Sequence, residues 1–401
     1  MEYDFTSHLE RHGMDAIAVD GVGHGTAPGA PKDGFDVIPM WVADMNFPTL
    51  PDIPAAITRR AQHPAFGYFS PTDAYYDAIC SWQKQRNGVQ GLTREHIGYE
   101  NGVLGGVVSA LSVMAAPGDA VLVHSPTYIG FTHSLESAGY HIVHSPLHLD
   151  ENGVWRMDFA DMEQKLRQNH IHAAILCSPH NPCGRVWSRE ELEQAMEIYR
   201  RCDCYVISDE IWSDILLDGH KHIPTQSVSE DARQRTVALY APSKTFNLAG
   251  LIGSYHIIYN SRLRDRVKAA GGRSHYNSMN VLSMHALIAA YSDAGSRWVD
   301  ELCAVLSGNV RYACDHIAAR YPGVRVAHPE GTYMLFLDCS GWCAAHGCTL
   351  DDLLRAGWDV GVAWQDGRPF HGPCAIRMNL ALPLDRVQEA FRRLDTYVFR
   401  A

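Results

Sequence analysis

The chain has 401 residues, of which 46% are hydrophobic and 20% are charged, a composition typical of a globular protein. This length predicts two domains, or one large domain with a smaller appendage. The formal net charge of −11 and the lack of a dense run of Lys and Arg argue against a nucleic-acid-binding protein or one that binds an anionic membrane.

Taken in chain order, the first 50 or so residues are rich in Gly, Pro and Asp and predict an irregular arm. Apolar residues at helical spacing predict a helix over 72–87. Helical segments then alternate with short apolar runs, a pattern typical of a parallel sheet buried on both faces. The predicted strands are 120–124, 139–144, 172–177, 204–208, 236–240 and 252–258, and the predicted helices between them are 103–116, 127–138, 158–168 and 188–201.

The last third of the chain no longer shows the alternation of helices and apolar strands. Two long helical stretches are predicted at 260–293 and 295–320, and mixed strands and helices follow, ending in an amphipathic helix up to Phe399. We therefore predict an α/β fold with a large domain over 51–293 and a smaller α+β domain over 294–401. Residues 1–50 are expected to form an N-terminal arm and part of the small domain.

The sequence shows no targeting signal and no disulfide framework, and we therefore expect a cytoplasmic protein. The N-terminus lacks an apolar stretch behind a basic start, and no segment approaches the roughly 18 apolar residues of a membrane span. The 11 cysteines have no framework spacing, which indicates reduced thiols. Cys202 and Cys204 lack a second Cys/His pair nearby, so no metal site is predicted. His220 and His222 lie in a polar loop pattern and are predicted to be solvated.

Three polar residues follow three of the predicted strands. Asn181 comes after 172–177, Asp209 after 204–208 and Lys244 after 236–240. Ligands of open α/β sheets bind at the carboxyl ends of the strands, so we expect these side chains to converge at one edge of the sheet. Each residue alone is commonly a turn, cap or solvated residue, and only the combination predicts a site.

The motifs around these residues resemble a known family. SPHNPCG, SDEI, APSKTFNLAGL and IRMNLALP are similar, in order and spacing, to the fold-type I enzymes of the class I/II aminotransferase superfamily, which use pyridoxal 5′-phosphate (PLP). PMWVADMNF, HPAFGYF and SDEIWSD resemble its branch of cystathionine β-lyase-like C–S lyases of the MalY/PatB type. The resemblance covers residues 39–391. It implies a mostly parallel seven-stranded sheet, PLP as cofactor, and a homodimer with a shared active site.

The resemblance also implies roles for single residues. Lys244 matches the lysine that holds PLP as a Schiff base and then moves the substrate Cα proton. Asp209 matches the carboxylate beside the pyridine nitrogen, and Tyr128 matches the aromatic residue that covers the ring. Asn181 matches the donor to the ring oxygen and also contacts substrate. Arg377 matches the arginine that binds the substrate carboxylate through its planar guanidinium.

Further residues match phosphate-binding positions. Gly102, Val103 and Leu104 open a predicted helix, whose free N–H groups favour an anion. Ser243 is a candidate additional donor. Tyr68 resembles the tyrosine that reaches the phosphate from the other subunit.

Some positions depart from the family pattern. Ile252 stands where many aminotransferases carry a phosphate-binding arginine, which favours the lyase branch. Trp212 stands where the branch usually has His, and its indole N–H could donate to the cofactor. Asn46 stands where the branch usually has Asp. Asp44, which is expected to contact substrate, and Asn46 line the opening of the site in the resemblance, so substrate choice is expected to differ.

The expected activity is that of a PLP-dependent C–S β-lyase acting on L-cystathionine or a related L-cysteine S-conjugate. The products would be pyruvate, ammonia and a thiol. An aminotransferase of an L-amino acid is the alternative, because the same residues serve both reactions. A PLP-binding DNA regulator is disfavoured by the acidic charge of the chain.

Overall fold

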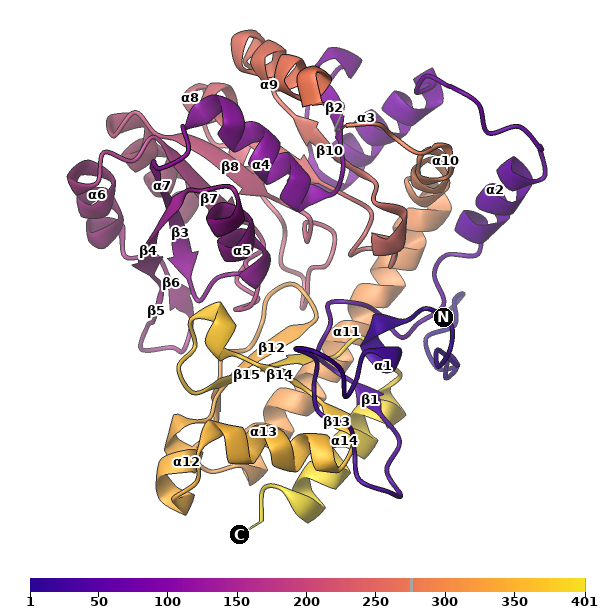
Figure 1. Ribbon diagram of the computed structural model, residues 1–401, viewed down its shortest axis with the longest axis vertical. Coiled ribbons are helices and arrows are strands. Elements are labelled where there is room, and N and C mark those ends of the chain that lie inside the picture. The colour runs from indigo at the N-terminus through magenta and orange to yellow at the C-terminus, as the bar shows by residue number, and fades with distance from the viewer. Residues whose placement is uncertain (275–276, 401) are drawn as a thin grey trace.

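The computed structural model describes residues 1–274 and 277–400, and its largest feature is a seven-stranded sheet (Figure 1). Its strands are β2 (Ile97–Glu100), β3 (Ala120–Ser125), β4 (His141–Pro146), β7 (Ala173–Cys177), β8 (Tyr205–Asp209), β9 (Thr236–Tyr240) and β10 (Ser254–Ile257). They lie in the order β2-β10-β9-β8-β7-β3-β4. Strands β4, β3, β7, β8 and β9 run parallel, whereas β10 is antiparallel to both neighbours. The predicted α/β fold with a mostly parallel sheet is confirmed.

Helices cover both faces of this sheet, which explains the continuous apolar runs in the sequence. Every residue of β7 and β9 is buried. Along β7, Ala173 and Ile175 face one hydrophobic cluster, while Ala174 and Leu176 face another. The first cluster packs against α4 (Val103–Met114), α5 (Ile129–Ser137) and α9 (Ser261–Ser274), and the second against α6 (Phe159–Gln168), α7 (Arg189–Arg201) and α8 (Glu230–Arg235).

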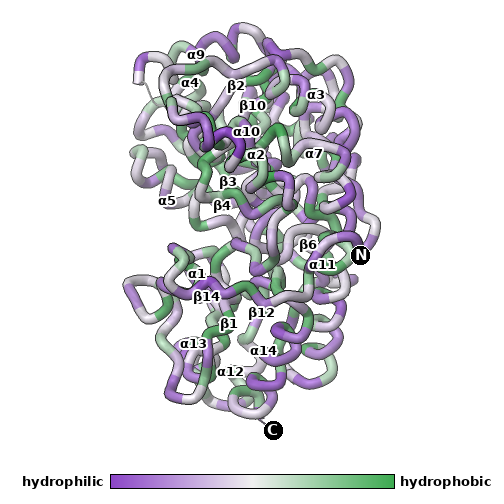
Figure 2. The backbone as a smooth tube through the Cα atoms, turned by 90° about the vertical axis from the view of Figure 1, so that its right-hand side faces the viewer, coloured by the Kyte–Doolittle hydropathy of each residue, from purple (hydrophilic) through white to green (hydrophobic). Residues whose placement is uncertain are grey.

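Figure 2 shows the matching hydropathy pattern, since apolar residues gather in the strands and alternate with polar ones along the outer helices. Helix α7 is such a helix and buries Leu192, Met196 and Tyr199 on one side. It begins at a capping box, in which the Ser188 side chain accepts from the Glu191 N–H and the Glu191 carboxylate accepts from the Ser188 N–H.

Two of the sequence predictions need correction. The seventh strand, β2, was not predicted, because its four residues IGYE carry no continuous apolar run. The single helical stretch predicted over 260–293 was wrong, since α9 ends at Ser274 and α10 (Val281–Ala290) begins after Asn280. The Asn280 side chain caps α10 by accepting from the Ser283 N–H. The long helix predicted over 295–320 is α11 (Asp293–Arg320).

A second sheet is antiparallel and follows α11. Its strands are β11 (Arg325–Val326), β12 (Met334–Asp338), β14 (Gln365–Asp366) and β15 (Ala375–Asn379), in the order β11-β12-β15-β14. The N-terminal arm joins this part of the molecule through β1 (Ile38–Pro39), which pairs in parallel with β13 (Val362–Ala363). The other helices are α1 (Ile17–Asp20), α2 (Asp52–Ala61), α3 (Asp73–Asn87), α12 (Ser340–His346), α13 (Leu350–Asp359) and α14 (Leu384–Tyr397).

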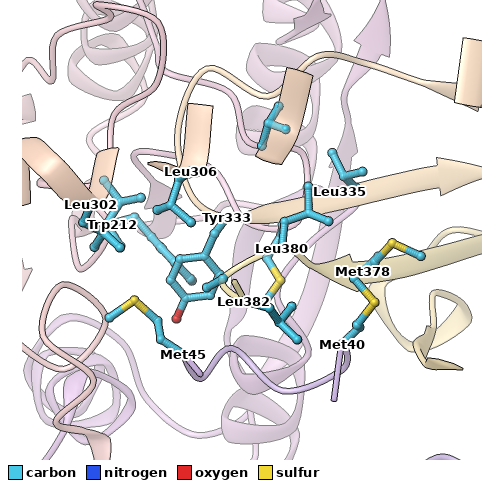
Figure 3. Close-up of a cluster of buried hydrophobic side chains, with 14 of the residues drawn as sticks. Met40, Met45, Trp212, Leu302, Leu306, Tyr333, Leu335, Met378, Leu380 and Leu382 are labelled. Atoms are coloured by element: carbon cyan, nitrogen blue, oxygen red, sulfur yellow. The ribbon is translucent and has the colours of Figure 1, made fainter. Parts of the chain in front are cut away.

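One hydrophobic cluster connects the arm, the large sheet and the second sheet (Figure 3). It contains Met40 and Met45 from the arm and Trp212 from the loop after β8. The remaining labelled members come from α11, from β12 with the residue before it, and from β15 with the residues after it: Leu302, Leu306, Tyr333, Leu335, Met378, Leu380 and Leu382. The cluster therefore fixes the arm and β15 against the loops that follow the parallel strands. Among the described residues no helix is both long enough and apolar enough to cross a membrane.

Candidate active site

The parallel strands bring three of the predicted side chains to one edge of the large sheet. Asp209 is the last residue of β8, Asn181 follows β7 and Lys244 follows β9. Since β8 pairs with β7 on one side and β9 on the other, the three residues lie at the same carboxyl edge. Asp209 pairs with Leu239 in the ladder between β8 and β9, and Lys244 follows β9 a few residues later.

Lys244 is a half-buried side chain whose amine end lies among buried groups. Its Nζ donates to the Ala43 carbonyl over 2.9 Å and lies 5.8 Å from the centre of the Trp212 ring. Burial lowers the pKa of Lys244 to about 8, the charge of Arg377 adds to this, and Asp44 and Asp209 act in the opposite direction. A lysine of lowered pKa is more often neutral near pH 7, which is the form that acts as nucleophile or base.

Asp209 is a buried carboxyl group that accepts from a backbone N–H. Its Oδ1 accepts from the Ile211 N–H over 3.1 Å. Burial raises the pKa of Asp209 to about 7, while this hydrogen bond and Lys244 act against the rise. In the described part of the chain no cation lies within ion-pair distance of it. A buried carboxylate in this state is costly, so the position calls for a cationic partner.

Arg377 enters the site from β15 of the second sheet and is fully buried. Its Nη1 donates to Asn181 Oδ1 over 3.2 Å and its Nη2 to the Trp41 carbonyl over 3.0 Å. The guanidinium lies 4.4 Å from the centre of the Phe370 ring. Its Nε has no partner among the described residues, and burial lowers the pKa of Arg377 to about 10. A buried guanidinium with a free N–H and no paired carboxylate is suited to an anionic ligand.

Tyr128 follows β3 and directly precedes α5, and burial raises the pKa of its hydroxyl. Its ring meets Phe131 edge-on, at 5.4 Å between ring centres. Gly130 makes room for this ring, because a Cβ at that position would lie 2.4 Å from Cε1 of Tyr128. The position of the Tyr128 ring therefore requires that residue 130 has no side chain.

The start of α4 provides an anion-binding position. Gly102 precedes the helix with φ of +77° and ψ of 156°, a conformation that favours glycine. The N–H groups at Val103 and Leu104 belong to the first turn, whose donors have no partner within the helix. Ser243 is half-buried and directly precedes Lys244.

Tyr68 is not part of the site within one chain. Its side chain is fully exposed, and all residues from 61 to 70 are exposed as well. Phe66 and Phe69 in the same segment expose 59% and 37% of their area. Ile252, where an arginine would stand in many aminotransferases, is also exposed and has φ of +50°.

The sequence interpretation missed two asparagines that hold the arm against the site. Asn379 Nδ2 donates to the carbonyls of Val42 and Asp44 over 2.7 and 2.6 Å. Asn247 donates to the Met45 carbonyl over 2.9 Å and accepts from its N–H over 3.1 Å. Both asparagines lie in the motifs IRMN and SKTFN, so the motifs carried this information.

Arg11, further along the arm, was missed as well. Its Nη2 pairs with Asp44 over 2.7 Å, and its Nη1 donates to Asn46 Oδ1 over 2.9 Å. None of the motifs quoted above includes this arginine, which precedes PMWVADMNF in the irregular arm.

The prediction that His222 is solvated was wrong. His222 is buried, and its Nε2 lies 2.6 Å from the carboxylate of Glu210, the fully buried neighbour of Asp209. Ser208 and Tyr240 also donate to Glu210. The polar loop folds back against the sheet at this point, whereas His220 is exposed as predicted.

Comparison with known proteins agrees with this geometry. Residues 36–394 match the model of the family "Aminotransferase class I and II". The chain is 36% identical to the cystathionine β-lyase PatB of Bacillus subtilis, over 90% of this chain and 92% of the relative, and 32% identical to protein MalY of Escherichia coli, over 84% of each. The crystal structure of the PLP-bound C–S lyase from Staphylococcus hominis superposes with a TM-score of 0.88 at 28% identity, covering 98% of this chain and 97% of that one. The chain therefore belongs to the aminotransferase class I and II family.

Proposed function

We propose that the protein is a PLP-dependent C–S β-lyase that cleaves L-cystathionine, or a related L-cysteine S-conjugate, to pyruvate, ammonia and a thiol. One observation carries the proposal: at one edge of the sheet meet a lysine of lowered pKa, a buried carboxyl group and a buried arginine, and neither of the last two has an oppositely charged partner among the described residues. The names of the relatives and the C–S lyase structure support the lyase reaction.

The residues at this edge fit PLP, because several of their charged and hydrogen-bonding groups lack a partner among the described residues. No cation pairs with Asp209 in the part of the chain that the structure describes, and a protonated pyridine nitrogen would supply one. The first turn of α4 after Gly102 offers donors for the phosphate, and Tyr128, which follows β3 at the same edge of the sheet, would cover a ring face. When bound, PLP supplies an aldehyde that bonds to amino groups and a ring that withdraws electrons from the substrate Cα.

The other roles belong to side chains of this protein. Arg377 binds the substrate carboxylate, and its hydrogen bonds to Asn181 and to the Trp41 carbonyl fix the plane of the guanidinium. The neutral amine of Lys244 takes the proton from Cα. Loss of that proton allows the Cβ–S bond to break, so the thiolate leaves.

A homodimer is part of the proposal. The aromatic residues Phe66, Tyr68 and Phe69 are exposed and lie in a segment, 61–70, in which every residue is exposed. Clustered exposed aromatic side chains are typical of a protein interface. We propose that Tyr68 reaches the phosphate position of the partner subunit.

The test uses purified protein loaded with PLP, incubated with L-cystathionine while pyruvate and free thiol are measured. Wild type should form both products and show a visible cofactor absorbance band, and Lys244→Ala should lose the band and the activity. Lys268→Ala, which changes an exposed lysine of α9, is the matched control. Amine transfer to an oxo acid without pyruvate would instead identify an aminotransferase, and a wild type that binds no PLP would refute the proposal.

A further inference from the structure

Asp214 is a buried carboxyl group that has no role in the proposed reaction as described so far. It lies in the loop after β8, five residues beyond Asp209 and two beyond Trp212. Burying a carboxyl group is unfavourable unless hydrogen bonds or a nearby charge compensate for the lost water. The groups that bond to Asp214 therefore indicate what this position does.

Two buried side chains from separate segments donate to Asp214. The hydroxyl of Thr245 donates to Oδ2 over 3.0 Å. The indole Nε1 of Trp82, in α3, donates to Oδ1 and Oδ2 over 3.1 and 3.3 Å. Burial raises the pKa of Asp214, and the charge of Arg86 and these hydrogen bonds counteract the rise. Asp214 thus joins α3 to the loop that follows β9.

Thr245 directly follows Lys244 in the chain. Both residues lie within a turn in which the Phe246 N–H donates to the Pro242 carbonyl over 2.9 Å. A β-branched side chain has few χ1 rotamers, so a bond that fixes the Thr245 hydroxyl also restrains the backbone at this residue. The bond to Asp214 therefore restrains the base of the Lys244 side chain.

The loop after β8 also lies near the amine end of the lysine. The Trp212 ring centre is 5.8 Å from Lys244 Nζ. Trp212 meets Tyr333 edge-on, at 4.8 Å between ring centres, in the hydrophobic cluster of Figure 3. One loop therefore limits the lysine at two places: Trp212 lies near its amine, and Asp214 holds its backbone through Thr245.

We propose that Asp214 is a positioning residue for Lys244. Through the hydroxyl of Thr245 it holds the lysine where the amine can condense with the aldehyde of PLP, releasing water, and later take the Cα proton. The inference rests on the proposed function and adds to it a residue that acts through a neighbour of the lysine. Both reactions depend steeply on placement, since a shift of about 1 Å can slow a reaction by about 100-fold.

The test measures how fast PLP attaches to Lys244 in cofactor-free protein, by borohydride reduction and mass spectrometry of the peptide that contains the lysine. Thr245→Val keeps the shape of the side chain and removes the hydroxyl. We expect it to slow attachment by about tenfold and to lower kcat for L-cystathionine by a similar factor. The KM should be unchanged because Arg377 keeps its contacts, and Thr245→Ser should restore both rates.

Trp82→Phe is the matched control, because it removes the other donor to the same carboxylate without touching the lysine loop. It should lower the urea midpoint of unfolding and leave attachment and kcat at their wild-type values. Asp214→Leu should slow attachment as much as Thr245→Val does, and the double variant should be no slower than either. Thr245→Ala takes the place of Thr245→Val if the valine variant does not fold.

Wild-type attachment and kcat in Thr245→Val would overturn the positioning role. Equal slowing by Trp82→Phe would also overturn it, because the carboxylate would then act through general stability alone. A wild type that attaches PLP at Lys244 but forms no pyruvate from L-cystathionine would refute the lyase function. In that case the attachment rates of the variants would still decide whether Asp214 positions the lysine.

Discussion

Replacing Asp209 by Asn tests whether the buried carboxylate of Asp209 needs a cationic ligand. The carboxyl group has a pKa of 3.8 in an unfolded chain and about 7 in the cofactor-free fold. Because the folded state holds the proton more tightly, this group lowers the free energy of unfolding as pH rises from about 4 to about 7. Each pKa unit corresponds to about 1.4 kcal/mol, so the ionised carboxylate destabilises the cofactor-free protein by up to ~4 kcal/mol above pH 7.

Asparagine keeps the shape and can still accept from the Ile211 N–H, but it carries no charge. We expect cofactor-free Asp209→Asn to be more stable than cofactor-free wild type at pH 8 and equal to it at pH 4. With PLP bound, the difference in the free energy of unfolding between the two proteins should become smaller or change sign, because only the wild type gains an ion pair with the cofactor. Asp315→Asn, on the exposed side of α11, is the control and should show no such pH dependence.

The assay is urea unfolding of the wild type and both variants from pH 4 to pH 8, with and without PLP, followed by tryptophan fluorescence. The free energy is compared as a difference between proteins at each pH, so that other titrating groups cancel. A cofactor-free Asp209→Asn that is less stable than wild type at pH 8 would show that the carboxylate already has a favourable partner, and the argument for a cationic ligand would fail.

Three further predictions follow from the same structure. Arg377→Lys should lower kcat/KM by about 100-fold, or ~2.7 kcal/mol, because an ammonium cannot make the planar two-point contact, and steady-state kinetics with unchanged absorbance of bound PLP would check this. Tyr68→Phe should weaken PLP binding in a titration without altering the stability of the cofactor-free protein, since its side chain is fully exposed in one subunit, and unaltered PLP affinity would contradict the shared site. Ser188→Ala should lower the free energy of unfolding by about 1 kcal/mol through the lost cap of α7 and leave kcat/KM unchanged, and a loss of activity at full stability would disprove a purely local effect.

Local patterns predicted most of the large sheet. Strands such as β7 and β9 are apolar throughout because both of their faces are covered, and this makes them visible in the sequence. Strand β2 escaped prediction because it lies at the edge of the sheet and only two of its four residues are buried. The break between α9 and α10 was missed because helical periodicity continues on both sides of it.

The sequence by itself determined which chemical groups stand at the carboxyl ends of the strands, since Asn181, Asp209 and Lys244 follow apolar runs whose order fixes their common edge. Only the tertiary structure decided how deeply those groups are buried and which charges lie near them. The pKa values of Lys244 and Asp209 depend on burial and on charges from distant parts of the chain. The contact of Arg11 with Asp44 joins positions 33 residues apart within an irregular arm. The arm has no helical or strand periodicity from which such a contact could be predicted. Such contacts arise from the packing of the arm against the second sheet, and packing between segments leaves no local signature in a single sequence.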